Sequence, residues 1–396
     1  MRLDPSRDRL LLLVASLALM VPVLRFYWPA GEGLDVIGYP LGRDFINVWS
    51  GPQVAFGDKV SALFDLGGYH EAIGRLFGTP LPFHNWGYPL FTLPAFWPLA
   101  QLPYFWALTV WTVGLFAIFA AIVLGEVEPE RRRQALLLLV FTPACLINMI
   151  GGQNGFLSAV LFLGGVLNID RRPILAGALI GLLTFKPHLG IVLPFALVAL
   201  GAWRVIASAA VTALALVAAS TAIFGVDAWR DYFAVVGPYQ TLLLQNFEGF
   251  YTNMMVSVLA SARKMGVPYS LALGVQVTVS LCVIAVAMWA VRRIADPCAR
   301  AFLLVSATLL ATPYAFNYDM TALGAVLVWV MVGRLPHRAE AGPAYILAWL
   351  APPATMMLAL FESNLGPLIT LFVLSSMFAV AVLDVVSREP RRLAAA

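Results

Sequence analysis

The chain has 396 residues, of which 61% are hydrophobic and 12% are charged, and its mean hydropathy is +0.85. A charged fraction of about half the usual value, together with recurrent apolar runs, excludes an ordinary soluble domain. The net charge of +4 comes from short, dispersed basic clusters and therefore does not indicate nucleic-acid binding.

Apolar segments along the whole chain predict an all-α polytopic membrane protein. A membrane-spanning helix needs about 20 residues. The number of apolar segments predicts about twelve transmembrane helices in one integral membrane domain, residues 1–396. They lie near 10–28, 104–124, 135–150, 155–169, 174–186, 188–201, 205–224, 269–291, 300–315, 320–333, 344–361 and 367–386. The first is interpreted as a retained helix rather than a signal peptide. Segments 174–186 and 188–201 are short and are expected to form a tight hairpin.

Short basic loops identify the cytoplasmic side, because loops rich in arginine and lysine stay in the cytoplasm. Their placement, for example at Arg131–Arg133 and Arg292–Arg293, predicts that both termini are cytoplasmic. The extracytoplasmic face then receives a structured, partly re-entrant first loop, 29–103, and a second long segment, 225–268. It also receives three short polar tips, at 151–154, 186–188 and 317–319. A reaction site is therefore expected to face outward.

The first loop contains Asp44, which is expected near the start of a small amphipathic helix around Trp49–Val54. Such a carboxylate is either a general base for an incoming hydroxyl or a solvated residue at a helix start. Farther along, His84 and Tyr88 lie in an aromatic stretch that prolines interrupt up to Pro103, which is typical of interfacial or re-entrant chain.

The three tips supply the other candidate residues. Lys186 is one of three lysines in the chain and lies between apolar segments, where it either binds an anion such as phosphate or snorkels to lipid headgroups. Its neighbour His188 either helps to bind the same anion or is a hydrogen-bonded structural histidine. Gln153 and Asn154 lie between glycines and either bind sugar hydroxyls or cap the next helix.

The third tip contains Tyr318 and Asp319. The tyrosine is either a substrate contact or an interface anchor. Asp319 either binds a substrate hydroxyl, holds a ligand cation, or pairs with Lys186 or an arginine. The cysteines lack metal-ligand spacing, and no Walker loop, G-x-S-x-G motif or dinucleotide fingerprint occurs in the sequence. We therefore expect no metal and no cofactor.

Four motifs in this order resemble the polyprenyl-phosphate-sugar-dependent transferases of glycosyltransferase family 87, within the GT-C superfamily. They are Gly42-Arg43-Asp44-Phe45 with Ala62-Leu63-Phe64-Asp65, Trp86-Gly87-Tyr88-Pro89 leading to Pro94 and Pro98, Gly152-Gln153-Asn154-Gly155, and Ala176-Gly177 through Phe185-Lys186-Pro187-His188. The chain departs from the family near Pro313, where members often have a histidine and this chain has Asn317-Tyr318-Asp319.

The resemblance implies a GT-C-like fold and an inverting hexosyl transfer at the outer face of a bacterial plasma (inner) membrane. The donor would be a polyprenyl-phosphate-linked sugar such as mannose, and the acceptor a glycolipid or polysaccharide. The catalytic base would be Asp44. Lys186, Arg43 and His188 would bind the donor phosphate, while Gln153, Asn154, Tyr318, Asp319, His84 and Tyr88 would contact the substrates.

Two other functional classes fit the same pattern. A lipid or solute transporter, or a flippase, also uses intramembrane charges and broken helices, although the hydropathy shows no internal repeat. A polymerase or ligase for lipid-linked glycans would share the outward site and use a different donor. An inactive scaffold protein is a third alternative.

Overall fold

The computed structural model describes residues 5–57 and 59–393, and 77% of the chain is helical. Helix α1 (Pro5–Phe26) is followed by a two-stranded antiparallel ribbon, β1 (Pro29–Gly31) and β2 (Leu34–Asp35). The first loop then contains α2 (Phe45–Gly57), a 3₁₀ turn at Val60–Phe64, α3 (Leu66–Phe77) and α4 (Thr92–Ala100). Three helices therefore lie within residues 29–103.

Most of the remaining helices overlap the predicted apolar segments, and two more lie within segment 225–268. They are α5 (Tyr104–Gly125), α6 (Pro129–Phe141), α7 (Pro143–Gly151), α8 (Gly155–Leu167), α9 (Pro173–Leu182), α10 (Leu193–Ala199), α11 (Trp203–Phe224), α12 (Val226–Asn246), α13 (Val258–Lys264), α14 (Tyr269–Val291), α15 (Pro297–Ala311), α16 (Thr321–Met331), α17 (Gly342–Leu360) and α18 (Leu365–Leu393). Further 3₁₀ turns occur at Leu183–Phe185, Pro187–Gly190, Phe250–Met254, Asn317–Met320 and Ala339–Ala341.

Within the described residues, five helices are long and apolar enough to cross a membrane, or six if the bent α6–α7 pair forms one span. The chain is therefore a multi-pass, all-helical membrane protein, but the expected count of about twelve spans is not confirmed. Several predicted spans, such as α8 and α15, form helices of 13 and 15 residues. These are shorter than the roughly 20 residues that a bilayer requires.

The predicted span 135–150 is divided where Pro143 follows Thr142. Proline lacks a backbone N–H and disfavours the helical conformation in the residue before it. Thr142 accordingly has extended backbone angles, φ −61° and ψ 125°, and the two helices meet at a bend of 56°. The predicted hairpin tip at Lys186 is likewise not a single tight turn, because a 3₁₀ turn lies on each side of this residue.

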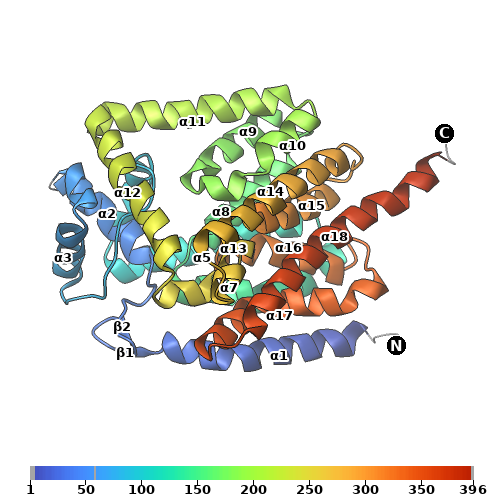
Figure 1. Cartoon of the computed structure of the whole chain (residues 1–396), viewed down its shortest axis with the longest axis horizontal. Coiled ribbons are helices and arrows are strands. Elements are labelled where there is room, and N and C mark those ends of the chain that lie inside the picture. The colour runs from blue at the N-terminus through green and yellow to red at the C-terminus, as the bar shows by residue number, and fades with distance from the viewer. Residues whose placement is uncertain (1–4, 58, 394–396) are drawn as a thin grey trace.

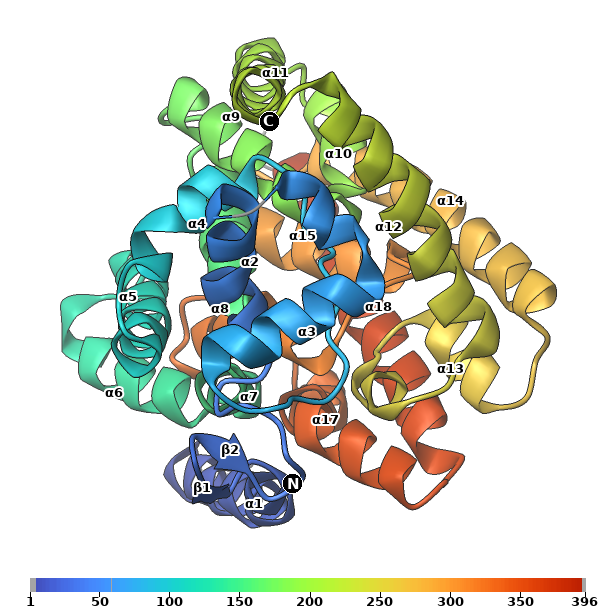
Figure 2. The ribbon, with the colours of Figure 1, turned by 90° about the vertical axis from the view of Figure 1, so that its left-hand side faces the viewer.

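The core consists of α8, α15 and α16, which are buried on almost every side, and the longer helices surround them. The N-terminal end of α1 and the C-terminal end of α18 lie at the right-hand end of Figure 1, whereas α2 and α3 lie at the left-hand end. Figure 2 looks onto that left-hand end, where α12 crosses beside α2 and α3. The termini thus share one end of the molecule, and the first loop occupies the other.

Helix α2 begins one residue after Asp44, as predicted, but it is not amphipathic. Its residues are buried around most of its circumference, because the first loop has its own apolar core. Trp86 covers Gly51 so closely that a Cβ at Gly51 would lie 2.1 Å from the indole ring. This packing fixes the axis of α2 and therefore the position of its first turn.

Helices α9 and α11 approach each other through small residues. A Cβ on Gly177 would lie 2.5 Å from the Cβ of Ser208, and one on Gly181 would lie 2.7 Å from the Cβ of Thr212. Ser208 also donates a hydrogen bond of 2.7 Å to the carbonyl oxygen of Ile174. Small residues four apart allow such close helix packing in membranes. The rest of α11 contacts little protein, since only 6% of its apolar stretch is buried inside the structure.

Candidate active site

The tip between α7 and α8 joins two regions that are distant in the sequence. Gly152 has φ +54°, and a Cβ there would lie 2.6 Å from the carbonyl oxygen of Gly42. A Cβ on Gly155 would lie 2.3 Å from the carbonyl oxygen of Tyr318. The Gly-Gly-Gln-Asn-Gly tip therefore packs against the residues before Asp44 on one side and against the 317–319 turn on the other.

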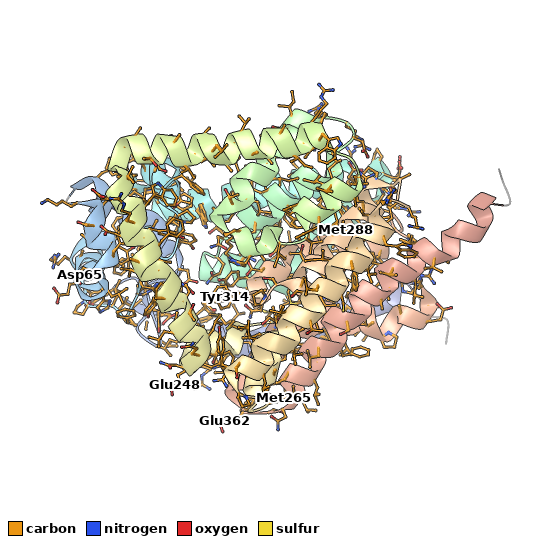
Figure 3. The ribbon with its side chains drawn as sticks, turned by 45° about the horizontal axis from the view of Figure 1, so that its top comes forward. Asp65, Glu248, Met265, Met288, Tyr314 and Glu362 are labelled. Atoms are coloured by element: carbon orange, nitrogen blue, oxygen red, sulfur yellow. The ribbon has the colours of Figure 1, made fainter. Side chains whose placement is uncertain are left out.

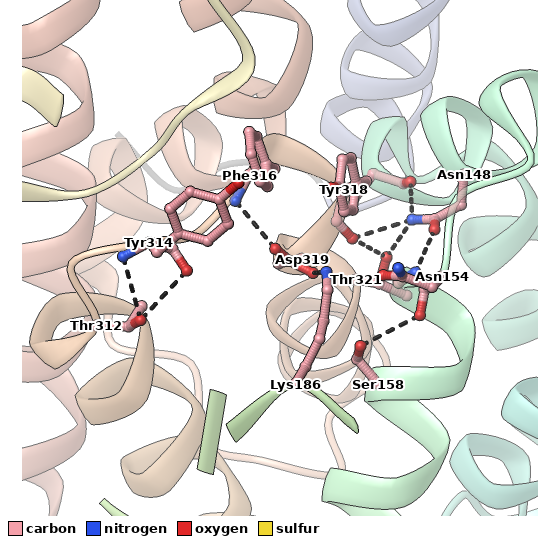
Figure 4. A network of polar contacts seen from close by, with 12 residues as sticks. Asn148, Asn154, Ser158, Lys186, Thr312, Tyr314, Phe316, Tyr318, Asp319 and Thr321 are labelled. Atoms are coloured by element: carbon pink, nitrogen blue, oxygen red, sulfur yellow. Dashed lines mark hydrogen bonds and ion pairs between the residues drawn. The ribbon is translucent and has the colours of Figure 1, made fainter. Parts of the chain in front are cut away.

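Asn148 of α7 holds the second of these junctions together. Its amide nitrogen donates to the carbonyl oxygen of Tyr318 at 3.0 Å and to the hydroxyl of Thr321 at 2.6 Å. Its amide oxygen accepts the backbone N–H of Gly155 at 2.8 Å (Figure 4). The sequence analysis missed this residue. The available signal was an asparagine inside an apolar helix, a position that is favourable only when the amide is hydrogen-bonded.

Lys186 and Asp319 form a buried ion pair. The Nζ of Lys186 lies 2.7 Å from Oδ1 of Asp319, and their side chains are 8% and 0% exposed. The second carboxylate oxygen accepts the backbone N–H of Phe316, and the ammonium lies 4.8 Å from the ring centre of Tyr318 (Figure 4). One of the predicted alternatives for Asp319, a pair with Lys186, is confirmed. The lysine points into the protein rather than toward headgroups.

Asp44 differs from Asp319 because its carboxylate has no protein partner. Among the residues that the structure describes, its side chain forms no hydrogen bond and no ion pair, and it is half-buried. Its charge nevertheless acts on the site, since it contributes to the raised pKa of Tyr88, for which burial is the larger cause. Asp319 also raises the pKa of the same tyrosine, so both carboxylates lie close enough for their charges to act on Tyr88.

Buried polar atoms without partners occur at the tip that contacts Tyr88 and on His84 of the same loop. Asn154 donates a hydrogen bond of 2.8 Å to the hydroxyl of Tyr88, while the side-chain oxygens of Asn154 and Gln153 are buried and unpartnered. The Nδ1 of His84 lies 2.6 Å from the carbonyl oxygen of Pro82, which fixes the proton on Nδ1. The Nε2 of His84 is buried and has no partner. Burial lowers the pKa of His84, against the opposing effect of Asp44, so its Nε2 is an acceptor at neutral pH.

Arg43 lies beside Asp44 in sequence but is occupied by other contacts. It pairs with Asp35 at 2.9 Å, donates to the carbonyl oxygen of Phe26 at 2.7 Å, and its guanidinium lies 3.9 Å from the ring centre of Tyr27. The side chain therefore fastens the end of α1 to the β-ribbon and the start of α2. Its geometry favours a structural role over a contact with donor phosphate.

His188 lies on the lysine side of the cluster. Its ring meets Tyr314 edge-on at 5.3 Å between centres, and its Nε2 is buried without a partner. Figure 3 shows Tyr314 near the centre of the molecule, whereas Asp65 lies at its left-hand edge. A surface cavity of about 550 Å³ lies elsewhere, between Gly125–Arg132 and Val332–Arg334, and none of the predicted site residues lines it.

The geometry thus gathers Asp44, His84, Tyr88, Gln153 and Asn154 around one cluster, with the Lys186–Asp319 pair beside it. A comparison with family models matched residues 86–313 to glycosyltransferase family 87, and neither curated proteins nor solved structures gave a match. The matched range includes Tyr88, the tip and Lys186, whereas Asp44 and Asp319 lie outside it. Because the match covers more than half of the chain, the protein belongs to glycosyltransferase family 87 and is a membrane glycosyltransferase.

Proposed function

We propose that the protein transfers a hexose, with mannose as the first candidate, from a polyprenyl-phosphate-linked donor to a glycolipid or polysaccharide. The observation that carries this proposal is the contrast between the two acids of the site. Asp319 is neutralised by Lys186, whereas Asp44 has no protein partner and acts on the same tyrosine. Asp44 is therefore the carboxylate that is free to accept a proton.

In the proposed reaction, the acceptor hydroxyl oxygen bonds to the anomeric carbon of the donor sugar. The bond between that carbon and the phosphate oxygen breaks, and polyprenyl phosphate leaves with the bonding electrons. Asp44 takes the hydroxyl proton as the general base. Attack opposite the leaving group inverts the anomeric configuration. The leaving phosphate needs charge stabilisation more than protonation, which fits a site containing a buried ammonium.

Lys186 is proposed to hold the donor phosphate. An ammonium has three N–H groups, and Asp319 accepts one of them. Asp319 then orients Lys186 rather than contacting a sugar itself. The unpartnered Nε2 of His188 is a second candidate contact for the phosphate. Arg43 is left out of this set because its guanidinium already serves Asp35 and Phe26.

The sugars are proposed to bind the polar groups around Tyr88. The oxygens of Gln153 and Asn154 and the Nε2 of His84 accept hydrogen bonds, which suits a ligand rich in hydroxyl groups. Tyr318, stacked on Phe316 with ring centres 5.2 Å apart, offers an aromatic face on the lysine side. The first loop, which carries Asp44, His84 and Tyr88, lies at the end opposite the N-terminal end of α1 and the C-terminal end of α18 (Figure 1), which supports an outward-facing loop with cytoplasmic termini.

The test uses purified protein in lipid nanodiscs with a panel of radiolabelled polyprenyl-phosphate hexoses and a membrane-lipid extract as acceptor. We expect label to enter a new product with one donor, and Asp44→Asn to lower the rate by about 10²–10⁴-fold, the usual contribution of a general base. Asp65→Asn is the matched control. Asp65 caps α3 by accepting the N–H of Gly68, and asparagine caps equally well.

Two results would contradict the proposal. Transfer at the wild-type rate by a folded Asp44→Asn protein would remove the base assignment. Absence of transfer from every donor, with the thermal unfolding transition intact, would instead reject the polyprenyl-phosphate hexoses as donors. Inversion is checked separately, by determining the anomeric configuration of the product with nuclear magnetic resonance.

A further inference from the structure

Helix α12 lies along the loop that carries His84 and Tyr88. The ring of Tyr239 is 6.5 Å from that of Phe83, and the ring of Trp229 is 6.4 Å from that of Phe91. The two segments therefore run in opposite directions, with residues 84–90 facing the part of α12 between Trp229 and Gln240. Figure 2 shows α12 beside the first-loop helices α2 and α3.

Gln240 is the polar residue that α12 places over this loop. Its amide nitrogen lies close to Gly87, at 3.5 Å from the position that a Cβ would take there, so the Gln240 side chain packs against this loop. Its amide oxygen is buried and has no hydrogen-bond partner among the described residues. A buried acceptor without a partner is unfavourable, and native structures contain few of them. Ligand-binding sites are one place where such acceptors are retained.

The neighbours of Gln240 give the chemistry of the missing partner. Gly87 precedes Tyr88, whose hydroxyl is bound by Asn154. Unpartnered atoms also occur on Asn154, which binds this tyrosine, on its chain neighbour Gln153 and on His84 of the same loop, and each of them is an acceptor. Gln240 adds one more acceptor from a third part of the chain. A ligand that satisfies this set must donate several hydrogen bonds from neighbouring atoms, as a sugar ring does with its hydroxyls.

We propose that Gln240 binds a ring hydroxyl of one of the two sugar substrates and helps to determine which sugar is accepted. This inference rests on the proposed function, because it gives α12 a role in the same site. The hydroxyl belongs either to the donor hexose or to a sugar of the acceptor. Measuring the KM of each substrate separately distinguishes these two sources.

The test compares Gln240→Met, Gln240→Glu and Gln245→Met. Methionine keeps the length of the side chain and removes the acceptor, whereas glutamate keeps an acceptor oxygen. Gln245 is exposed on the same helix and is the matched control. We expect Gln240→Met to raise the KM of one substrate about tenfold with kcat unchanged, the effect of losing one hydrogen bond of about 1.4 kcal/mol. Gln240→Glu should restore most of the loss, and Gln245→Met should match wild type.

A second readout separates this inference from the proposed reaction. Binding of methyl α- and β-hexopyranosides is followed by saturation-transfer nuclear magnetic resonance, which requires no turnover. A weaker signal with Gln240→Met than with wild type and Gln245→Met supports sugar binding even if the donor assignment fails. Unchanged KM values and unchanged glycoside binding in a Gln240→Met protein that unfolds at the wild-type temperature would overturn the inference, leaving Gln240 a packing residue. If Gln240→Met does not fold, Gln240→Asn, which withdraws the amide by one methylene, takes its place in the comparison, and Gln240→Glu remains the rescue variant.

Discussion

Lys186 and Asp319 are 133 residues apart in the sequence, yet Nζ of one lies 2.7 Å from Oδ1 of the other. The pair is almost completely buried and carries no net charge. The sequence presents one buried lysine and two candidate acids, Asp44 and Asp319. In the folded protein the lysine and Asp319 neutralise each other, which leaves Asp44 as the one free carboxylate of these three groups. This relationship supports the proposed role of Asp44 as the base and the proposed role of Asp319 in orienting the lysine.

Replacing one member of this ion pair should reduce the stability of the protein more than replacing both members with apolar residues. Asp319→Ala leaves a buried ammonium without its counter-charge, and we expect the free energy of unfolding to fall by about 3–5 kcal/mol. The double variant Lys186→Met/Asp319→Leu should recover much of this loss while remaining inactive. Thermal unfolding in nanodiscs measures both. Arg230→Ala, which breaks an exposed pair with Asp227, is the control and should leave the unfolding temperature unchanged. Equal losses in the single and double variants would contradict the expectation.

Acid should destabilise the protein through His84. Burial lowers the pKa of this histidine below its ordinary value of about 6.5. As the pH falls through about 6.5, the unfolded chain takes up a proton that the folded chain does not, so the free energy of unfolding decreases and then levels off below the folded pKa. The loss of unfolding temperature between pH 7.5 and pH 5 should be smaller in His84→Gln than in wild type. Parallel losses in the two proteins would exclude His84 as a source of acid sensitivity.

Gly155 should tolerate no side chain. A Cβ would lie 2.3 Å from the carbonyl oxygen of Tyr318 and 2.6 Å from Oδ1 of Asn148, so Gly155→Ala must displace the turn that carries Asp319. We expect a stability loss of about 1–3 kcal/mol and, because misplacement by about 1 Å costs catalysis heavily, a fall in kcat of about 10²-fold. Gly114→Ala on α5 is the control, since a Cβ there meets no atom within 4 Å. Wild-type kcat in Gly155→Ala would show that this junction does not position the site.

Arg43 distinguishes a structural arginine from a phosphate ligand. Arg43→Lys loses the guanidinium geometry that reaches both Asp35 and the carbonyl of Phe26. We expect a lower unfolding temperature and a lower kcat, because the start of α2 and Asp44 shift together, with the KM of the donor unchanged. Kinetics at varied donor concentration measure this. A raised donor KM at an unchanged unfolding temperature would return Arg43 to the phosphate site.

Much of the helix order could be predicted from hydropathy alone. Apolar runs such as Tyr104–Gly125 and Tyr269–Val291 form uninterrupted helices, since length and composition suffice for a span. The number of spans could not be predicted in the same way. At Pro143 and on each side of Lys186, local backbone chemistry divides apolar sequence into short helices. Hydropathy averages over windows and does not detect such breaks.

The site was predictable in its parts but not in its pairing. The tips and the first loop pointed to Asp44, Lys186 and Asn154, because polar residues in apolar surroundings are costly. The pairing of Lys186 with Asp319, the bonds of Asn148 and the position of Gln240 depend on contacts between distant segments. No periodicity in the sequence encodes such contacts, so only the folded structure reveals them.

The sparse protein contacts of α11 have a practical consequence for biochemical work. Apart from its glycine-lined contact with α9, this helix presents its apolar surface to the bilayer, and the chain continues from it through Gly225 directly into α12. Lipid therefore supports one end of the helix that carries Gln240. A detergent that strips annular lipid should therefore loosen α11 and α12 first. The extracted protein would lose turnover while its helical circular dichroism signal stays unchanged, and reconstitution into lipid would restore turnover.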